Sequence, residues 1–314
     1  MNTTSSSPVD ATGRLPGGER ALVLGGGGST GNAWLIGVVA GLFDAGLDVT
    51  TADLTVGTSA GSTAAAQLGG ATPAELVAAA LAPAPPRQPS AGRPEAPGAR
   101  PAPGSVRSAA DQMARTQAII DAASDVADMR RRMGAAALEL DAASDGSWSE
   151  RWRATVAARL SRQDWPERAV LLTAVDARTG EPVVLDRRSG IGLADAVAAS
   201  CSSGLPYRIG DDRYIDGGYR RNENADLAAG CARVLVLSPF GGRSRHPHAW
   251  GSGLATQVAE LRAGGSAVET IVPDDDAERL FGANAMDPSL RPVAARAGHA
   301  QGEALATRLR TFWA

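Results

Sequence analysis

The sequence predicts a three-layer α/β fold with a central, mostly parallel sheet. Short runs of buried-type apolar residues alternate with segments whose apolar residues recur at helical spacing. This alternation is typical of parallel strands that are connected by helices. The chain has 314 residues, which is enough to bury a substantial core. We expect one large domain at residues 19–314, preceded by a disordered tail at 1–18 that is rich in Ser, Thr, Gly and Pro.

The first half of the domain carries the strand–helix–strand–helix order on which this prediction depends. The predicted elements are a strand at 21–24, a helix at 32–45, a strand at 54–56, a helix at 59–68 and a helix at 72–81. A Pro-rich insertion at 83–104 follows and cannot form a regular element.

The segment at 105–162 is predicted to be helical, with an apolar stripe formed by Val126, Met129, Met133 and Leu140. Such a stripe most often marks a helix pair that packs into the core. The alternative is a cap over the active site, where flexible methionine side chains adapt to varied ligands.

The second half returns to the α/β pattern. Strands are predicted at 169–175 and 182–185, which form a hairpin or adjacent strands around Arg178–Gly180. The elements that follow are a helix at 193–200, a strand at 214–215, a strand at 233–238, a helix at 253–262, a strand at 268–272 and a helix at 287–312. A break in this last helix is predicted near Gly298, because glycine weakens a helix interior.

The composition excludes several classes of function. Hydrophobic residues make up 44% of the chain and charged residues 21%, and the net charge of −3 does not suggest binding to nucleic acid. All 31 basic residues are arginines, which excludes lysine-dependent chemistry and indicates a GC-rich bacterial genome. The longest apolar run, 33–43, is too short to span a bilayer. Only two cysteines are present, Cys201 and Cys231, which favours a reducing, cytoplasmic compartment.

The first motif with chemical meaning is Gly57-Thr-Ser-Ala-Gly61, which lies between a predicted strand and a predicted helix. A sharp turn at this place would lift the hydroxyl of Ser59 clear of the sheet as a nucleophile. The two glycines would admit the crowded backbone of such a turn. A serine that only caps the helix is the structural alternative.

The second motif is the glycine run that ends the first strand and contains Gly26, Gly27, Gly28 and Gly31. Its bare N–H groups suit an oxyanion or a phosphate. The run also satisfies the dinucleotide pattern G-x-G-x-x-G, which needs an acidic residue at the end of the second strand. That position holds the serine motif instead, so a nucleotide-binding or regulatory protein is the weaker alternative.

The chain has three histidines: His246, His248 and His299. The order Ser59, Asp216, His246 matches that of α/β-hydrolase triads, but more sheet normally precedes the nucleophile in that fold. The histidines lie in a loop of solvated character and in the terminal helix. Without a histidine, an aspartate would have to take the serine proton itself, and this weak base would need burial and a preorganised site. By its composition alone, the later Asp216-Gly217-Gly218 favours a turn.

These motifs together resemble those of the patatin-like phospholipase family. The glycine run, the serine motif and the later Asp216-Gly217-Gly218 are similar to its three signatures, and the stretches 199–206 and 222–227 agree with the segments around the last one. The resemblance spans roughly residues 20–230, apart from the Pro-rich insertion and the helical segment. It implies a patatin-like three-layer fold and a Ser–Asp dyad that needs no histidine. We expect the segment at 105–162, which lies outside the resemblance, to be a helical cap segment within this domain.

The resemblance also implies the roles of individual residues. Ser59 would be the nucleophile, Asp216 the general base, and the amides of Gly26, Gly27 and Gly28 the oxyanion hole. The remaining motif glycines would support the elbow and the turns: Gly31, Gly57, Gly61, Gly217 and Gly218. The family commonly has Arg or Lys where this chain has Thr30, which removes a cation near the oxyanion site.

The expected reaction is hydrolysis of a lipid acyl ester through an acyl-Ser59 intermediate, without metal or cofactor. The expected partners are the acyl-ester substrate and, transiently, a membrane surface, with no nucleic acid. Acyl transfer to an acceptor other than water is the nearest alternative, because it uses the same intermediate.

Overall fold

The computed structural model describes residues 19–82 and 109–314. The predicted tail at 1–18 and the predicted Pro-rich insertion at 83–104 lie outside the described residues, as do the first four residues of the predicted helical segment. No helix within the described ranges has both the length and the apolar composition needed to cross a bilayer.

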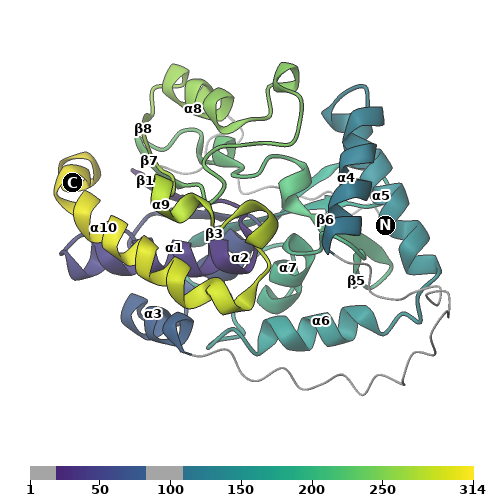
Figure 1. Cartoon of the computed structure of the whole chain (residues 1–314), viewed down its shortest axis with the longest axis horizontal. Coiled ribbons are helices and arrows are strands. Elements are labelled where there is room, and N and C mark those ends of the chain that lie inside the picture. The colour runs from purple at the N-terminus through teal and green to yellow at the C-terminus, as the bar shows by residue number, and fades with distance from the viewer. Residues whose placement is uncertain (1–18, 83–108) are drawn as a thin grey trace.

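The centre of the molecule is an eight-stranded sheet with the order β5-β6-β3-β2-β1-β7-β8, in which β4 pairs with β3 (Figure 1). Its strands are β1 (Arg20–Leu24), β2 (Leu54–Gly57), β3 (Ala169–Asp176), β4 (Pro182–Leu185), β5 (Tyr207–Ile209), β6 (Asp212–Asp216), β7 (Arg233–Leu237) and β8 (Ala267–Ile271). The run β3-β2-β1-β7-β8 is parallel, whereas β4, β5 and β6 join by antiparallel pairing. The predicted mostly parallel sheet is confirmed, and the antiparallel pairs make it a mixed sheet.

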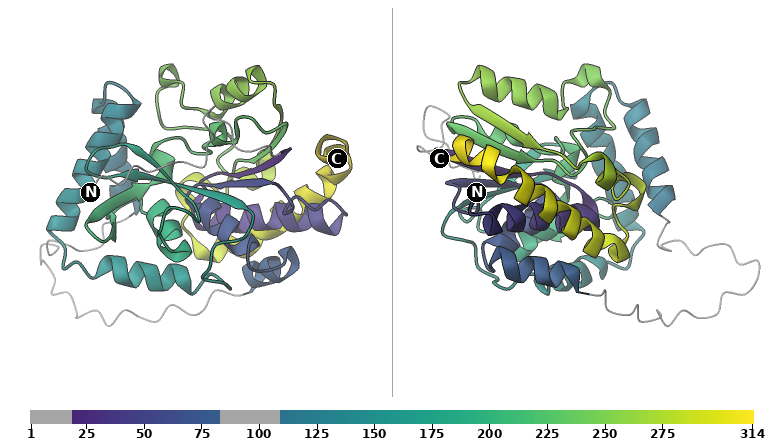
Figure 2. Two further views of the ribbon diagram at one scale, coloured as in Figure 1. Left: turned by 180° about the vertical axis from the view of Figure 1, so that it is seen from behind. Right: turned by 60° about the vertical axis from the view of Figure 1, so that its left-hand side comes forward.

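Helices cover both faces of this sheet (Figure 2). They are α1 (Gly28–Asp44), α2 (Ala60–Leu68), α3 (Pro73–Leu81), α4 (Ala109–Ala122), α5 (Val126–Ala142), α6 (Trp148–Ala157), α7 (Leu193–Ser200), α8 (Leu254–Ala263), α9 (Asp275–Glu278) and α10 (Arg291–Trp313). Because side chains alternate along a strand, β1 buries Leu22 and Leu24 against the layer of α1 and α10. It buries Ala21 and Val23 against the opposite layer, which contains α8. This double burial explains why the parallel strands have continuous apolar sequences.

The described part of the predicted cap, residues 109–162, consists of α4, α5 and α6. Met129 and Met133 of α5 are buried in a cluster with Val175 of β3 and Ile215 of β6. These methionines are therefore core side chains of the layer that α4 and α5 form on the sheet.

Apart from shifts of up to four residues at the ends of several other elements, the structure differs from the prediction at the start of the first helix, at β5 and at Gly298. The first helix begins at Gly28 and not at Asn32, because the glycine run itself enters the helix. Strand β5 was not predicted, since three residues are too short for an alternating pattern. The predicted break near Gly298 is wrong, because α10 continues without interruption from Arg291 to Trp313.

Gly298 is tolerated inside α10 because this helix lies directly against α1 (Figure 1). A Cβ atom at Gly298 would meet the backbone carbonyl of Trp34, and one at Gly302 would meet that of Val38. On α1, Gly37 and Gly41 face the backbone of α10 in the same way. Glycine at these positions therefore permits backbone-to-backbone packing that any larger residue would prevent.

We predict that Gly302→Val destabilises the fold by about 3 kcal/mol, because the added side chain overpacks the α1–α10 contact. Ala304→Val, on the exposed face of the same helix, should cost less than about 1 kcal/mol through helix propensity alone. Urea unfolding of the two variants measures both values. Equal losses would show that the contact with α1 does not require glycine.

Candidate active site

The turn after β2 holds Ser59 in a backbone conformation that residues other than glycine rarely adopt. Ser59 has φ 52° and ψ −113°, and it is followed at once by α2. A Cβ atom at Gly61 would collide with the carbonyl of Leu24 in β1, and one at Gly57 would lie 2.7 Å from the Cα of Ser62. Both glycines of the serine motif are thus required for the sharp turn, which lifts the Ser59 hydroxyl above the strand end. Strain of this kind at a turn is typical of functional sites.

The structure brings Asp216 to this turn from the end of β6. The Oγ of Ser59 donates a hydrogen bond to Oδ2 of Asp216 at 2.8 Å. Strand β3 brings Ser59 and Asp216 together, because its Leu172 pairs with Gly57 and its Ala174 pairs with Asp216. The ends of β2 and β6 therefore pair with residues of β3 that are only two positions apart.

Asp216 is a buried carboxyl group with few partners. It is 7% exposed, and its Oδ1 accepts a hydrogen bond from the N–H of Gly218 at 2.8 Å. Burial raises the pKa of Asp216 to about 6 from 3.8, against the opposing effect of the hydrogen bonds from Gly218 and Ser59. Gly217 permits this placement, because a Cβ atom there would collide with Thr173 of β3. The result is a carboxylate that is a stronger base than an exposed aspartate.

The glycine run lies beside the serine turn and offers free N–H donors. Within the described residues, the amides of Gly27 and Gly28 have no hydrogen-bond partner. The amide of Gly26 is engaged, since it donates to the carbonyl of Asn222 at 3.0 Å. Gly28 has φ +65°, and Gly31 donates its N–H to the carbonyl of Gly27 at 3.0 Å. The run thus presents two unpaired donors at the positive end of α1.

Sequence reasoning did not single out Ala60, the residue after the serine. Its N–H also lacks a hydrogen-bond partner in the described part of the chain. The position directly after the nucleophile of an elbow commonly supplies an oxyanion donor, and this was the signal available in the sequence.

Two asparagines that follow the Asp-Gly-Gly motif connect the parts of the site. Asn222 donates from Nδ2 to the carbonyl of Gly26 at 3.3 Å, in addition to accepting from its amide. Asn224 is fully buried, and its Nδ2 donates to Oγ1 of Thr58 at 2.9 Å and to the carbonyl of Gly217 at 3.2 Å. These bonds tie the glycine run, the serine turn and the aspartate turn to one segment.

None of the three histidines is bonded to Ser59 or Asp216. The Nδ1 of His246 lies 3.0 Å from Oγ of Ser252, and burial lowers the pKa of His246 to about 4. His299 pairs with Asp44 at 2.8 Å, and His248 is exposed. In the described ranges, no group of three or more His, Cys, Asp and Glu side chains is placed to hold a metal ion.

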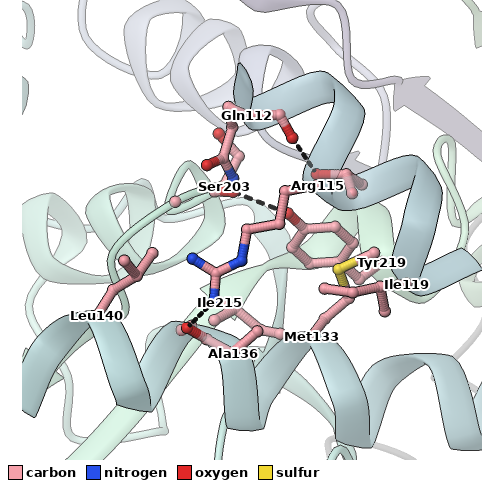
Figure 3. A pocket seen from close by; sticks show the side chains of 12 residues that line it. Gln112, Arg115, Ile119, Met133, Ala136, Leu140, Ser203, Ile215 and Tyr219 are labelled. Atoms are coloured by element: carbon pink, nitrogen blue, oxygen red, sulfur yellow. Dashed lines mark hydrogen bonds between the residues drawn. The ribbon is translucent and has the colours of Figure 1, made fainter. Parts of the chain in front are cut away.

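A small pocket lies between α4, α5 and the segments that flank Asp216 (Figure 3). Ile119, Met133 and Ile215 form part of its apolar wall. Arg115 reaches across it and donates to the carbonyl of Ala136 at 2.9 Å. The pocket therefore combines apolar surface with one cation beside the aspartate turn.

The raised pKa of Asp216 predicts a cost in stability. The folded protein holds the Asp216 proton more tightly than the unfolded chain does, so stability falls as pH rises from 3.8 to about 6. Asp216→Asn removes the buried charge and should raise the free energy of unfolding at pH 8, by up to about 3 kcal/mol. The gain should shrink as pH falls to about 4.5, as urea unfolding at each pH would show.

Asp212→Asn is the control, because Asp212 lies at the exposed start of the same strand. It should give no comparable gain at pH 8. A gain for Asp216→Asn that does not depend on pH would contradict the explanation by burial.

Comparisons with known proteins agree with the motifs. The family model described as patatin-like phospholipase matches residues 22–229, which is more than half of the chain. A search of curated proteins finds no match. Among solved structures, the chain is similar to VipD from Legionella pneumophila, with 13% identity, a TM-score of 0.40, and coverage of 96% of this chain and 69% of that one.

It is also similar to the type III effector protein ExoU, with 13% identity, a TM-score of 0.33, and coverage of 91% of this chain and 53% of that one. These two likenesses are too distant to carry an argument about activity. The family match covers the glycine run, the serine turn and the aspartate turn together. This protein belongs to the patatin-like phospholipase family of lipid acyl hydrolases.

Proposed function

We propose that the protein hydrolyses carboxylic esters of lipids through an acyl-Ser59 intermediate, with Asp216 as the only protein base. The observation that carries this proposal is the 2.8 Å hydrogen bond from Ser59 Oγ to Asp216 Oδ2, in the strained turn after β2. As Oγ attacks the ester carbonyl, its proton passes to Oδ2 of Asp216. The proton then goes to the departing alkoxide, which leaves as an alcohol and leaves the acyl group on Ser59.

Deacylation repeats the same steps with water as the nucleophile. Asp216 takes a proton from the attacking water and returns it to Oγ when the carboxylic acid leaves. The burial that raises the pKa of Asp216 to about 6 strengthens this base and still leaves it ionised at neutral pH.

The oxyanion of each tetrahedral intermediate is assigned to the free amides of Gly27 and Gly28, with Ala60 as a third donor. These N–H groups are fixed before the reaction begins, so that they need no reorganisation when charge develops. Gly26 is not an oxyanion donor in this proposal, because its amide is bonded to Asn222. Glycine is needed there for close packing, because a Cβ atom would lie 2.7 Å from Oδ1 of Asn222.

The contact with lipid and the cellular location of the enzyme are inferred from the proposed reaction and from the composition of the chain. A lipid ester as substrate implies transient contact with a membrane surface or a lipid aggregate. The arginine-only basic composition and the two free cysteines support a bacterial, cytoplasmic location.

We predict that a fluorophosphonate labels Ser59 and that Ser59→Ala abolishes ester hydrolysis. The reason is that the strained turn holds this hydroxyl next to its base and leaves Ser59 only half-buried. Mass spectrometry should place the adduct on the peptide that contains Gly57–Gly61, and a panel of esters of increasing chain length would define the acyl preference. An adduct on another serine of an active preparation would refute the assignment.

The second prediction concerns the base. Asp216→Asn should lower kcat by at least ~10²-fold in a folded protein, because the Ser59 proton then has no acceptor. The wild-type kcat/KM should rise with pH through about 6, since Asp216 must be ionised to act.

The control for this prediction is a variant in which all three histidines are replaced by alanine. It should retain most of the activity and the same acidic limb, because no histidine contacts the dyad. Loss of the limb in this variant would assign it to a histidine and would require a Ser-His-Asp mechanism instead.

A further inference from the structure

Three consecutive residues at the end of α7 contact the backbone of both members of the dyad. The Oγ of Ser200 accepts a hydrogen bond from the N–H of Ser59 at 3.0 Å. The thiol of Cys201 donates to the carbonyl of Ser59 at 3.1 Å, and the carbonyl of Ser202 accepts from the N–H of Asp216 at 2.9 Å. We call residues 200–202 the clamp segment.

The clamp segment is itself firmly held. The Oγ of Ser202 donates to the carbonyl of Ala198 at 2.6 Å, which closes the end of α7. The carbonyl of the next residue, Ser203, accepts hydrogen bonds from the hydroxyl of Tyr219 and from Nε2 of Gln112, both at 2.8 Å (Figure 3). The segment is therefore anchored from α7, from α4 and from the turn after Asp216.

The turn at Ser59 needs support from the clamp segment, because the hydrogen bonds of α2 do not hold the Ser59 N–H. With φ 52°, Ser59 precedes α2 and its N–H takes no part in the hydrogen bonds of that helix. In the described residues, the hydroxyl of Ser200 is the only partner of this N–H, and Ser200 is fully buried. A donor in this half-buried turn that loses its partner favours any rearrangement that recovers a hydrogen bond. Here the rearrangement would move the nucleophile.

We propose that Ser200 is a positioning residue of the reaction, which holds the Ser59 turn in its strained conformation so that Oγ stays aligned between Asp216 and the oxyanion donors. This inference rests on the proposed function, because it assigns a role in the chemistry of Ser59. Ser200 does not touch the substrate, so its effect should be seen in the chemical step and not in substrate binding.

Ser200→Ala tests this proposal, because alanine removes only the acceptor and suits the end of the alanine-rich α7. We expect kcat and the rate of fluorophosphonate labelling to fall about tenfold to 10²-fold with an unchanged KM. All of the enzyme should still be labelled at the end of the reaction, whereas a loss of folded protein would lower the labelled fraction. The acidic limb near pH 6 should stay in place, because Ser200 has no hydrogen bond to Asp216.

Two further variants sharpen the test. Ser200→Thr keeps the hydroxyl and should recover most of the lost rate. Ser266→Ala removes another buried hydroxyl, which donates to the carbonyl of Cys231 at 2.7 Å. Ser266 immediately precedes β8 and so lies at the amino end of the parallel strands, opposite Ser59. Its removal should leave kcat unchanged.

The outcomes separate this inference from the proposed function. If wild-type protein is not labelled at Ser59, the proposed function fails and the role of Ser200 fails with it. If wild-type protein is labelled but folded Ser200→Ala reacts at the wild-type rate, only the positioning role is overturned. An equal loss of kcat in Ser266→Ala, or a folded Ser200→Thr as slow as Ser200→Ala, would also overturn it.

Discussion

The hydrogen bond between Ser59 and Asp216 is the interaction on which the rest of the site depends, and strand β3 makes it possible. The two residues are 157 positions apart in sequence. Strand β3 pairs in parallel with β2 and in antiparallel fashion with β6, so that the ends of both strands meet its central residues. A shift of either strand by one residue along β3 would turn its side chains to the other face and separate the two groups. Register in the sheet is thus a condition for the hydrogen bond between Ser59 and Asp216.

The site is held by a layer of buried polar contacts rather than by the sheet alone. Asn222 bonds the glycine run, Asn224 ties the serine turn to the aspartate turn, and the clamp segment is hydrogen-bonded to the backbone of both Ser59 and Asp216. Beneath this layer, Glu223 is 1% exposed and accepts hydrogen bonds from Asn222 and Ser238. A network in which each member is bonded is rigid, which suits donors that must be in place before charge develops.

The proposed function of Ser59 and Asp216 competes with the stability of the fold. The buried carboxylate of Asp216 and the positive φ of Ser59 both cost free energy in the folded state. The double-sided burial of the parallel strands and the direct packing of α1 against α10 offset these costs. The α1–α10 contact also bears on the site, because α1 begins at Gly28, inside the glycine run that supplies the free donors.

The sequence by itself determined the fold class, the family and the motif residues, because these depend on local patterns. Apolar periodicity predicted most strands and helices, and the glycines of each motif were recognisable from the tight turns they permit. Only the tertiary structure decided that the amide of Gly26 is already bonded, that Gly298 lies within an unbroken helix, and that the hydroxyl of Ser200 accepts a hydrogen bond from the amide of Ser59. Each of these depends on a contact between residues far apart in the chain, such as Ser59 and Ser200, and such contacts leave no periodic trace in the sequence.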